Sequence, residues 1–329
     1  MRTLGTDLTR RAVLGAAVAG AVAGPAAAQI PGQPGHVKGP RVFMDYDQAE
    51  LDAAYDQSVY APNMKQVTSR YVTNSDVARS HLGPPQTFAY GPTAVETLDV
   101  YRTKRANAPT LIFFHGGAWR GGRARDYAFP AEVYVSAGAN YVVPDFVWVQ
   151  DAGGNLATVV DQVRRSVAWV YRNAAKFGGD PKRLYIAGHS SGGHLAGVLV
   201  TTDWHKEFGL PADLVKGGVC GSGMYDLYPV SLSARSRYVK FTDEVIAAFS
   251  SLRHLDKLNC PVSVVYGTYE TPEFQRQNRA FAAAVKAAGK PVDLHVAAGY
   301  NHFEVMETLA NPYGFMGRAA LARMQLAPA

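Results

Sequence analysis

Gly188-His189-Ser190-Ser191-Gly192 is the stretch of this sequence that decides the fold. It has the form G-x-S-x-G, with the apolar, β-prone residues 183–187 before it and the largely apolar residues 193–200 after it. This context predicts a strand, a sharp turn and a helix, which together expose the hydroxyl of Ser190 at the carboxyl edge of a sheet. Glycine fits positions 188 and 192, because a side chain there would meet the crowded strand and helix.

The composition is that of a globular protein. The chain has 329 residues, of which 47% are hydrophobic and 18% are charged, and these values exclude a disordered chain. The formal net charge is +6, of which residues 1–28 carry two units. No cluster of Lys and Arg with interleaved aromatic residues stands out, so we expect no nucleic-acid partner.

Residues 1–28 have the form of a twin-arginine export signal. Arg10 and Arg11 precede an apolar run over residues 12–23, and small residues at 26–28 offer a cleavage site before Gln29. This pattern predicts a periplasmic or secreted protein. The run is short and rich in Gly and Ala, so we expect no stable membrane anchor; an uncleaved anchor is the alternative. Residues 29–44 are predicted to form a flexible lead-in.

Residues 45–325 alternate strand and helix patterns and are predicted to form one domain. A short amphipathic helix is expected within residues 45–55 and a strand hairpin at 86–90 and 95–102. The remaining predicted strands lie at 110–114, 141–147, 183–187, 215–220, 261–266 and 292–297, and the helices at 155–176, 193–200, 273–288 and 304–324. Apolar strands that alternate with helices predict an α/β fold, with a mostly parallel eight-stranded sheet covered by helices on both faces.

Residues 225–258 interrupt this alternation. They contain several aromatic residues and no strand pattern, which predicts a small cap inserted over the carboxyl edge of the sheet. We expect Tyr225 of this cap, and Trp119 outside it, to line an apolar substrate pocket, with plain core packing as the alternative. Cys220 and Cys260 fall at opposite ends of neighbouring strands, so we expect two buried free thiols.

A serine hydroxyl becomes a nucleophile when a base takes its proton and an acid orients that base. His302 follows the last predicted strand and is our candidate for the base. The other histidines after Ser190 fall in helices, in the cap or inside a strand: His194, His205, His254 and His295. Two acids follow the preceding strand. Glu273 sits in the first turn of a helix, where the helix dipole explains it, so we choose Glu270.

Acyl transfer also requires donors for a developing oxyanion. His115-Gly116-Gly117-Ala118-Trp119 follows the predicted central strand. The expected donors are the amides of Gly117 and Ala118, together with that of Ser191 after the nucleophile. His115 is interpreted as a brace for this loop. We find no spacing typical of a metal site and no phosphate-binding loop, so we expect no metal and no cofactor.

These motifs together resemble the α/β-hydrolases, in the branch that contains hormone-sensitive-lipase-like carboxylesterases and arylformamidases (kynurenine formamidases). The residues are His115 to Trp119, Gly188 to Ala196, Glu270 to Gln277 and Asn301 to Glu304. The resemblance implies a catalytic triad of Ser190, His302 and Glu270, although the family often has Asp at the acid position. It implies hydrolysis of small apolar or aromatic esters; an arylformamidase and a catalytically inactive binding module are the alternatives. An export signal fits poorly with a cytoplasmic pathway, which favours the esterase.

Overall fold

The structure, a computed structural model, describes residues 35–328. The predicted export signal and residues 29–34 of the predicted lead-in lie outside these residues. Within them, no helix combines the length and the apolar character that crossing a membrane requires.

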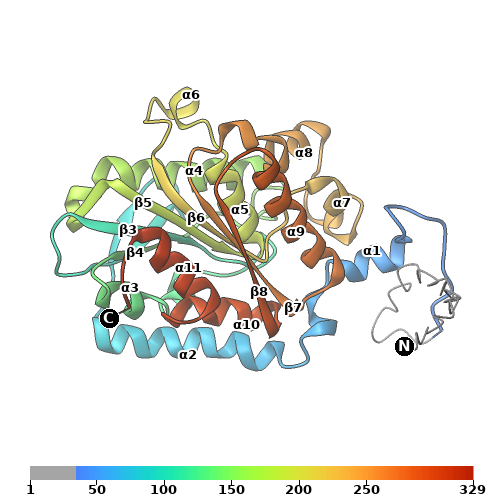
Figure 1. Ribbon diagram of the computed structural model, residues 1–329, viewed down its shortest axis with the longest axis horizontal. Helices are drawn as coiled ribbons and strands as arrows, with labels where there is room; N and C mark the ends of the chain where they lie inside the picture. The colour runs from blue at the N-terminus through green and yellow to red at the C-terminus, as the bar shows by residue number, and fades with distance from the viewer. Residues whose placement is uncertain (1–34, 329) are drawn as a thin grey trace, which may run out of the picture.

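One twisted sheet organises the molecule (Figure 1). Its eight strands lie in the order β1-β2-β4-β3-β5-β6-β7-β8. The β1–β2 and β2–β4 pairs are antiparallel, and every other pair is parallel. The strands are β1 (Gln86–Ala89), β2 (Thr97–Tyr101), β3 (Ala108–Phe114), β4 (Asn140–Pro144), β5 (Gly179–His189), β6 (Val215–Gly221), β7 (Val262–Tyr269) and β8 (Val292–Asn301). The mostly parallel eight-stranded sheet predicted from the sequence is confirmed.

Helices cover both faces of the sheet, and the central strand shows why. Every residue of β3 is buried, and its side chains alternate between the two faces. Ile112 and Phe114 join the core beneath one group of helices, while Leu111 and Phe113 join the core on the opposite face. The first group includes α4 (Leu156–Asn173), α5 (Ser191–Val200) and α9 (Pro272–Ala287); the second includes α2 (Met64–Leu82), α3 (Ala131–Ser136), α10 (His302–Glu307) and α11 (Phe315–Met324).

The insertion between β6 and β7, which is predicted to be a cap, contains no strand. It contains α7 (Leu227–Ser231), the short 3-10 helix η4 (Ala234–Arg237) and α8 (Asp243–Phe249). The helix α1 (Gln48–Ala54) packs beside it, where the Gln48 side chain donates to the carbonyl of Leu232. One small helix, α6 (Trp204–Phe208), follows α5. Cys220 and Cys260 are free and buried, as predicted.

Two helical predictions differ from the structure. The sequence interpretation assigned no element to residues 64–82, which form the long helix α2. The single helix predicted for residues 304–324 is wrong, since α10 and α11 are separated by a short 3-10 helix and a turn. Pro312 and Gly314 lie in that interruption, and a proline inside a helix removes a backbone hydrogen bond.

Candidate active site

Ser190 stands on the turn between β5 and α5. Its backbone has φ 60° and ψ −125°, a strained combination for a residue with a side chain. The surrounding glycines make this turn possible, because a Cβ at Gly188 would overlap the carbonyl of Gly192. A Cβ at Gly192 would in turn overlap the carbonyl of Phe114. The predicted strand–turn–helix geometry is therefore confirmed.

The structure brings Ser190 and His302 together although they lie 112 residues apart. His302 is the first residue of α10, directly after β8. Its Nε2 lies 2.8 Å from the Oγ of Ser190, and its Nδ1 lies 3.0 Å from the Oε2 of Glu270. A carboxylate only accepts hydrogen bonds, so Nδ1 carries the proton and Nε2 is free to accept from the serine hydroxyl.

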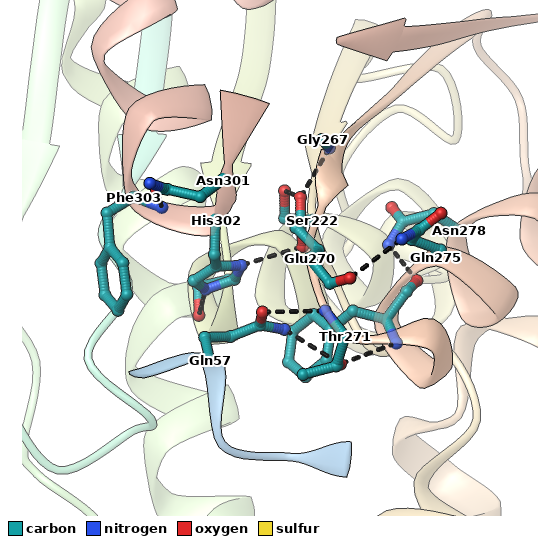
Figure 2. Close-up of polar contacts among 12 residues, drawn as sticks. Gln57, Ser222, Gly267, Glu270, Thr271, Gln275, Asn278, Asn301, His302 and Phe303 are labelled. Carbon is teal, nitrogen blue, oxygen red and sulfur yellow. Dashed lines mark hydrogen bonds and ion pairs between the residues drawn. The ribbon is translucent and has the colours of Figure 1, made fainter. Parts of the chain in front are cut away.

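Glu270 is fully buried and has partners for both oxygens. While Oε2 accepts from His302, Oε1 accepts from the Oγ of Ser222 at 2.6 Å and from the amide of Gly267 at 2.7 Å. Figure 2 shows Ser222 and Gly267 on one side of the carboxylate and His302 on the other. This arrangement fixes the direction in which Glu270 presents its second oxygen to the imidazole.

Glu273, the alternative acid, has a different role. It lies in the first turn of α9 and accepts two hydrogen bonds from Arg276 and one from the hydroxyl of Tyr55. Its carboxylate is therefore held by a cation on its own helix, and Glu270 is the acid that contacts His302.

The ring of His302 lies among other rings. Phe274 packs edge-on against it with centroids 5.1 Å apart, and the ring of His189 lies at 4.7 Å. Burial lowers the pKa of His189 well below its usual value, and the neighbouring His302 acts in the same direction. His189 is therefore neutral and adds no charge beside the candidate base.

The loop after β3 has an unusual backbone conformation. Gly117, Ala118 and Trp119 all have positive φ angles, of 114°, 56° and 59°. The amide of Trp119 donates to the Oγ of Ser191 at 3.1 Å, so it is already engaged. Among residues 35–328 no acceptor meets the amide of Gly117 or Ala118. Ser191 begins α5, where helical amides have no partner within the helix.

Two buried histidines, His115 and His194, stabilise this loop. Burial lowers the pKa of His115 to about 4, and its ring stacks between Tyr127 and Phe146. The interpretation of His115 as a brace agrees with this packing. His194 accepts from the Trp119 indole and contacts the carbonyl of Phe249 at 3.0 Å, which ties the loop to the cap.

The prediction that Trp119 and Tyr225 line a substrate pocket is wrong for this conformation. Trp119 is 1% exposed and Tyr225 is 0% exposed. Tyr225 stacks on Phe281 with centroids 4.1 Å apart, and its ring edge fits against Gly197, where a Cβ would collide with it. Both aromatic side chains belong to the hydrophobic core beside the candidate site.

One cluster outside the site has metal-ligating residue types. A ligand atom of His36, one of Asp47 and one of Glu50 lie within 4.8 Å of one another. Asp47 is the N-cap of α1 and forms a capping box with Glu50. Lys38 Nζ lies 3.0 Å from Oε2 of Glu50. The positive charge of this ammonium group disfavours the binding of a metal cation at the same place. We interpret this cluster as a structural N-terminal cap.

The chain is similar to known formamidases and esterases. A family model described as BD-FAE matches residues 98–217, which include Ser190 and the loop after β3 but neither Glu270 nor His302. A kynurenine formamidase of Danio rerio is 30% identical over 275 residues, which are 80% of this chain and 91% of that protein. Esterase LipC of Mycobacterium tuberculosis is 32% identical over 200 residues, which are 56% of this chain but 48% of that protein.

Solved structures share the fold at lower identity. A candidate thioesterase of Silicibacter sp. TM1040 superposes with a TM-score of 0.73 at 22% identity, over 82% of this chain and 98% of that one. The carboxylesterase EstE1, from a metagenomic library, gives a TM-score of 0.61 at 20% identity, also over 82% and 98%. At this identity the likeness concerns the fold alone.

Proposed function

Because this chain belongs to the esterase and formamidase branch of the α/β-hydrolase family, we propose that it is a carboxylesterase that uses Ser190 as its nucleophile. The observation that carries the proposal is the continuous contact from Ser190 Oγ through His302 to Glu270. Serine needs such a base to attack an ester at neutral pH.

The proposed mechanism has two steps. As Ser190 Oγ attacks the ester carbonyl, its proton passes to Nε2 of His302, while Glu270 stabilises the imidazolium through Nδ1. The same proton then goes to the departing alcohol, which leaves an acyl group on Ser190. In the second step His302 takes a proton from water, the hydroxide attacks the acyl carbonyl, and the proton returns to Ser190.

We assign the oxyanion hole to the amides of Gly117, Ala118 and Ser191. The amides of Gly117 and Ala118 meet no acceptor among the described residues, and that of Ser191 opens a helix. Both Gly117 and Ala118 lie within reach of solvent, which a donor to a substrate requires. Removal of one such donor costs other enzymes roughly 100- to 1,000-fold in kcat.

The first test is Ser190→Ala. We expect kcat on p-nitrophenyl butyrate to fall by about 10⁴- to 10⁶-fold, because the nucleophile is lost while the fold is retained. A fluorophosphonate probe should label the wild-type protein and not the variant. Ser69→Ala, which removes an exposed serine of α2, is the matched control and should retain full activity and labelling. A variant at Ser190 with wild-type activity would contradict the assignment.

A formamidase is the second candidate, because the kynurenine formamidase of Danio rerio spans most of this chain. The same serine, base and oxyanion donors would act on an N-formyl group. Values of kcat/KM for N-formylkynurenine and for phenyl esters of short acids distinguish the two. A preference for N-formylkynurenine would replace the carboxylesterase assignment and leave the role of Ser190 unchanged.

We also propose that the enzyme is exported through the twin-arginine pathway. The support is the sequence alone, in which Arg10 and Arg11 precede a short apolar run. Cell fractionation tests the proposal: replacement of both arginines by lysine should move the protein from the periplasm or medium to the cytoplasm. Unchanged export of that double variant would refute it.

A further inference from the structure

Two arginines that have no carboxylate partner among residues 35–328 lie in or beside the loop after β3. Arg120 directly follows Trp119 in that loop, and Arg235 belongs to η4 of the cap. They meet at Tyr238: the guanidinium carbon of Arg120 lies 4.5 Å from the centroid of the Tyr238 ring, and Nη1 of Arg235 donates to its hydroxyl at 3.0 Å. The cap and the loop therefore bring two positive charges to one place.

Arg235 lies near two aromatic side chains, and each of them connects to the candidate site. Its guanidinium carbon is 5.7 Å from the centroid of the Trp119 ring and 5.9 Å from that of Tyr55. On the first side, the amide of Trp119 donates to Ser191, the residue after the nucleophile. On the second side, Tyr55 packs on Phe274, which packs on the ring of the base.

The donors of Arg235 are only partly used. Nη2 donates to the carbonyl of Tyr55 at 3.1 Å, and Nη1 is engaged with Tyr238. Nε is buried and meets no acceptor among residues 35–328. A guanidinium offers five donors in a planar fork that suits a carboxylate, and a buried donor without a partner is costly. A ligand cannot reach the buried Nε, so the donors left for a bound carboxylate are the second hydrogens of Nη1 and Nη2.

The nearby acidic side chains are engaged elsewhere. Asp52 of α1 accepts from the amide of Ala234 and lies 3.7 Å from Arg237. Glu273 is held by Arg276. No ion pair to Arg120 or Arg235 exists within the part of the chain that the structure describes. Their charges are therefore uncompensated in the free protein.

We propose that Arg235 and Arg120 bind a negatively charged group of the substrate, so that the preferred substrates are carboxylic esters that carry a second, ionised carboxylate. This proposal rests on the proposed esterase function and names its substrate class. The two arginines set specificity, whereas Ser190, His302 and Glu270 perform the chemistry. Since attraction between exposed charges is screened by salt, the preference should weaken as ionic strength rises.

Two matched pairs of esters test the proposal. They also show whether the protein recognises the charge on the acyl side or on the alcohol side of the ester. The mono-p-nitrophenyl ester of glutarate is compared with p-nitrophenyl valerate, and p-acetoxybenzoate with its methyl ester. We expect wild-type kcat/KM to favour the charged member of at least one pair, mainly through KM. Arg235→Gln should lower that ratio by about tenfold, the size of a lost hydrogen bond between charged groups.

Further variants separate specificity from folding. Arg235→Lys keeps the charge without the planar fork, so it should retain part of the preference. Arg237→Gln is the matched control, because its side chain is 79% exposed and already lies near Asp52; it should leave the ratio unchanged. Circular dichroism melting verifies that each variant is folded. A wild-type preference for the neutral member of both pairs would overturn the proposal, as would an equal loss on both members in Arg235→Gln.

Binding provides a readout that does not depend on turnover. The same four esters are titrated by calorimetry into the Ser190→Ala protein, with and without Arg235→Gln. Tighter binding of a charged ester that disappears with Arg235→Gln supports the anion site even if wild-type protein hydrolyses none of the esters. In that case the proposed esterase function is refuted, whereas the proposed anion-binding site is supported. Equal binding of charged and neutral esters removes the site and leaves the esterase function intact.

Discussion

Ser222 is one of two donors that orient the carboxylate of Glu270. It is fully buried, it donates to Glu270 at 2.6 Å, and its φ of 47° lies in the left-handed region. Side chains other than glycine adopt that region at a cost. The backbone strain at Ser222 is retained together with a hydroxyl that points at the acid, and we infer that the hydroxyl is the reason.

This reasoning predicts an unusual outcome for Ser222→Gly. Glycine relieves the strain at positive φ, so the free energy of unfolding should stay the same or rise. Removal of the hydroxyl leaves the buried carboxylate with one donor fewer, so kcat on p-nitrophenyl butyrate should fall roughly 10- to 100-fold with little change in KM. Urea unfolding and steady-state kinetics measure the two effects.

The control for this prediction is Ser263→Ala. Ser263 is also buried, but it contacts Arg323 and is remote from Glu270 in the hydrogen-bond network. We expect normal kcat for it. A Ser222→Gly protein that is less stable and retains full kcat would show that Ser222 serves only the fold.

Residue types and their order predicted the centre of the site, but not its surroundings. Ser190, His302 and Glu270 each follow a strand, and parallel strands deliver their carboxyl ends to one edge. Ser222 also follows a strand, yet a single serine between glycines has no signature of its own. The sequence does not reveal that Trp119 and Tyr225 are buried, because an aromatic residue in a loop forms the same pattern whether it faces solvent or the core.

At the scale of elements, strands were easier to predict than helices. A strand such as β3 is buried on both faces, so every residue is constrained to be apolar or small. By contrast, α2 buries only a narrow stripe, formed by Val67, Tyr71, Ser75 and Ala78. The last two of these carry no strong apolar signal, and the exposed residues include several weak helix formers. The helix α2 is therefore stabilised mainly by packing against other elements, which its own sequence does not reveal.

That packing connects α2 to α10, the helix that carries the candidate base. Arg70 makes two hydrogen bonds to Glu307 of α10, and the Asn63 side chain donates to Glu304. Asn301 caps α10 and forms a capping box with Glu304. His302 lies between these contacts, so its backbone is fixed by a helix that sequence reasoning did not find. Figure 1 shows α2 running beside α10.

At the scale of the whole molecule, buried neutral histidines set the response to acid. Burial lowers the pKa of His115 and of His194 to about 4 and that of His189 well below its usual value. In the unfolded chain these side chains titrate near about 6.5. Below that pH the unfolded state binds protons at these histidines and the folded state does not, so the free energy of unfolding falls as pH decreases.

We therefore predict that the free energy of unfolding decreases between about pH 6.5 and about pH 5, by up to about 1.4 kcal/mol per pH unit for each buried histidine. Urea unfolding at several pH values measures the slope. His194→Gln retains an acceptor for the Trp119 indole and should reduce the slope. His81→Gln, at an exposed position, should not. A slope that is the same in wild type and in His194→Gln would contradict this account.

The contact between α2 and α10 also has a consequence for the growing chain. The nucleophile is made 112 residues before the base, whereas Arg70 and Glu307 are separated by 237 residues. Since chains are synthesised from the amino terminus, α2 is made well before α10, its partner. A chain that has not yet reached His302 contains Ser190 and the loop after β3 but not the candidate base. The proposed triad therefore cannot form before α10, a helix of six residues, has been made.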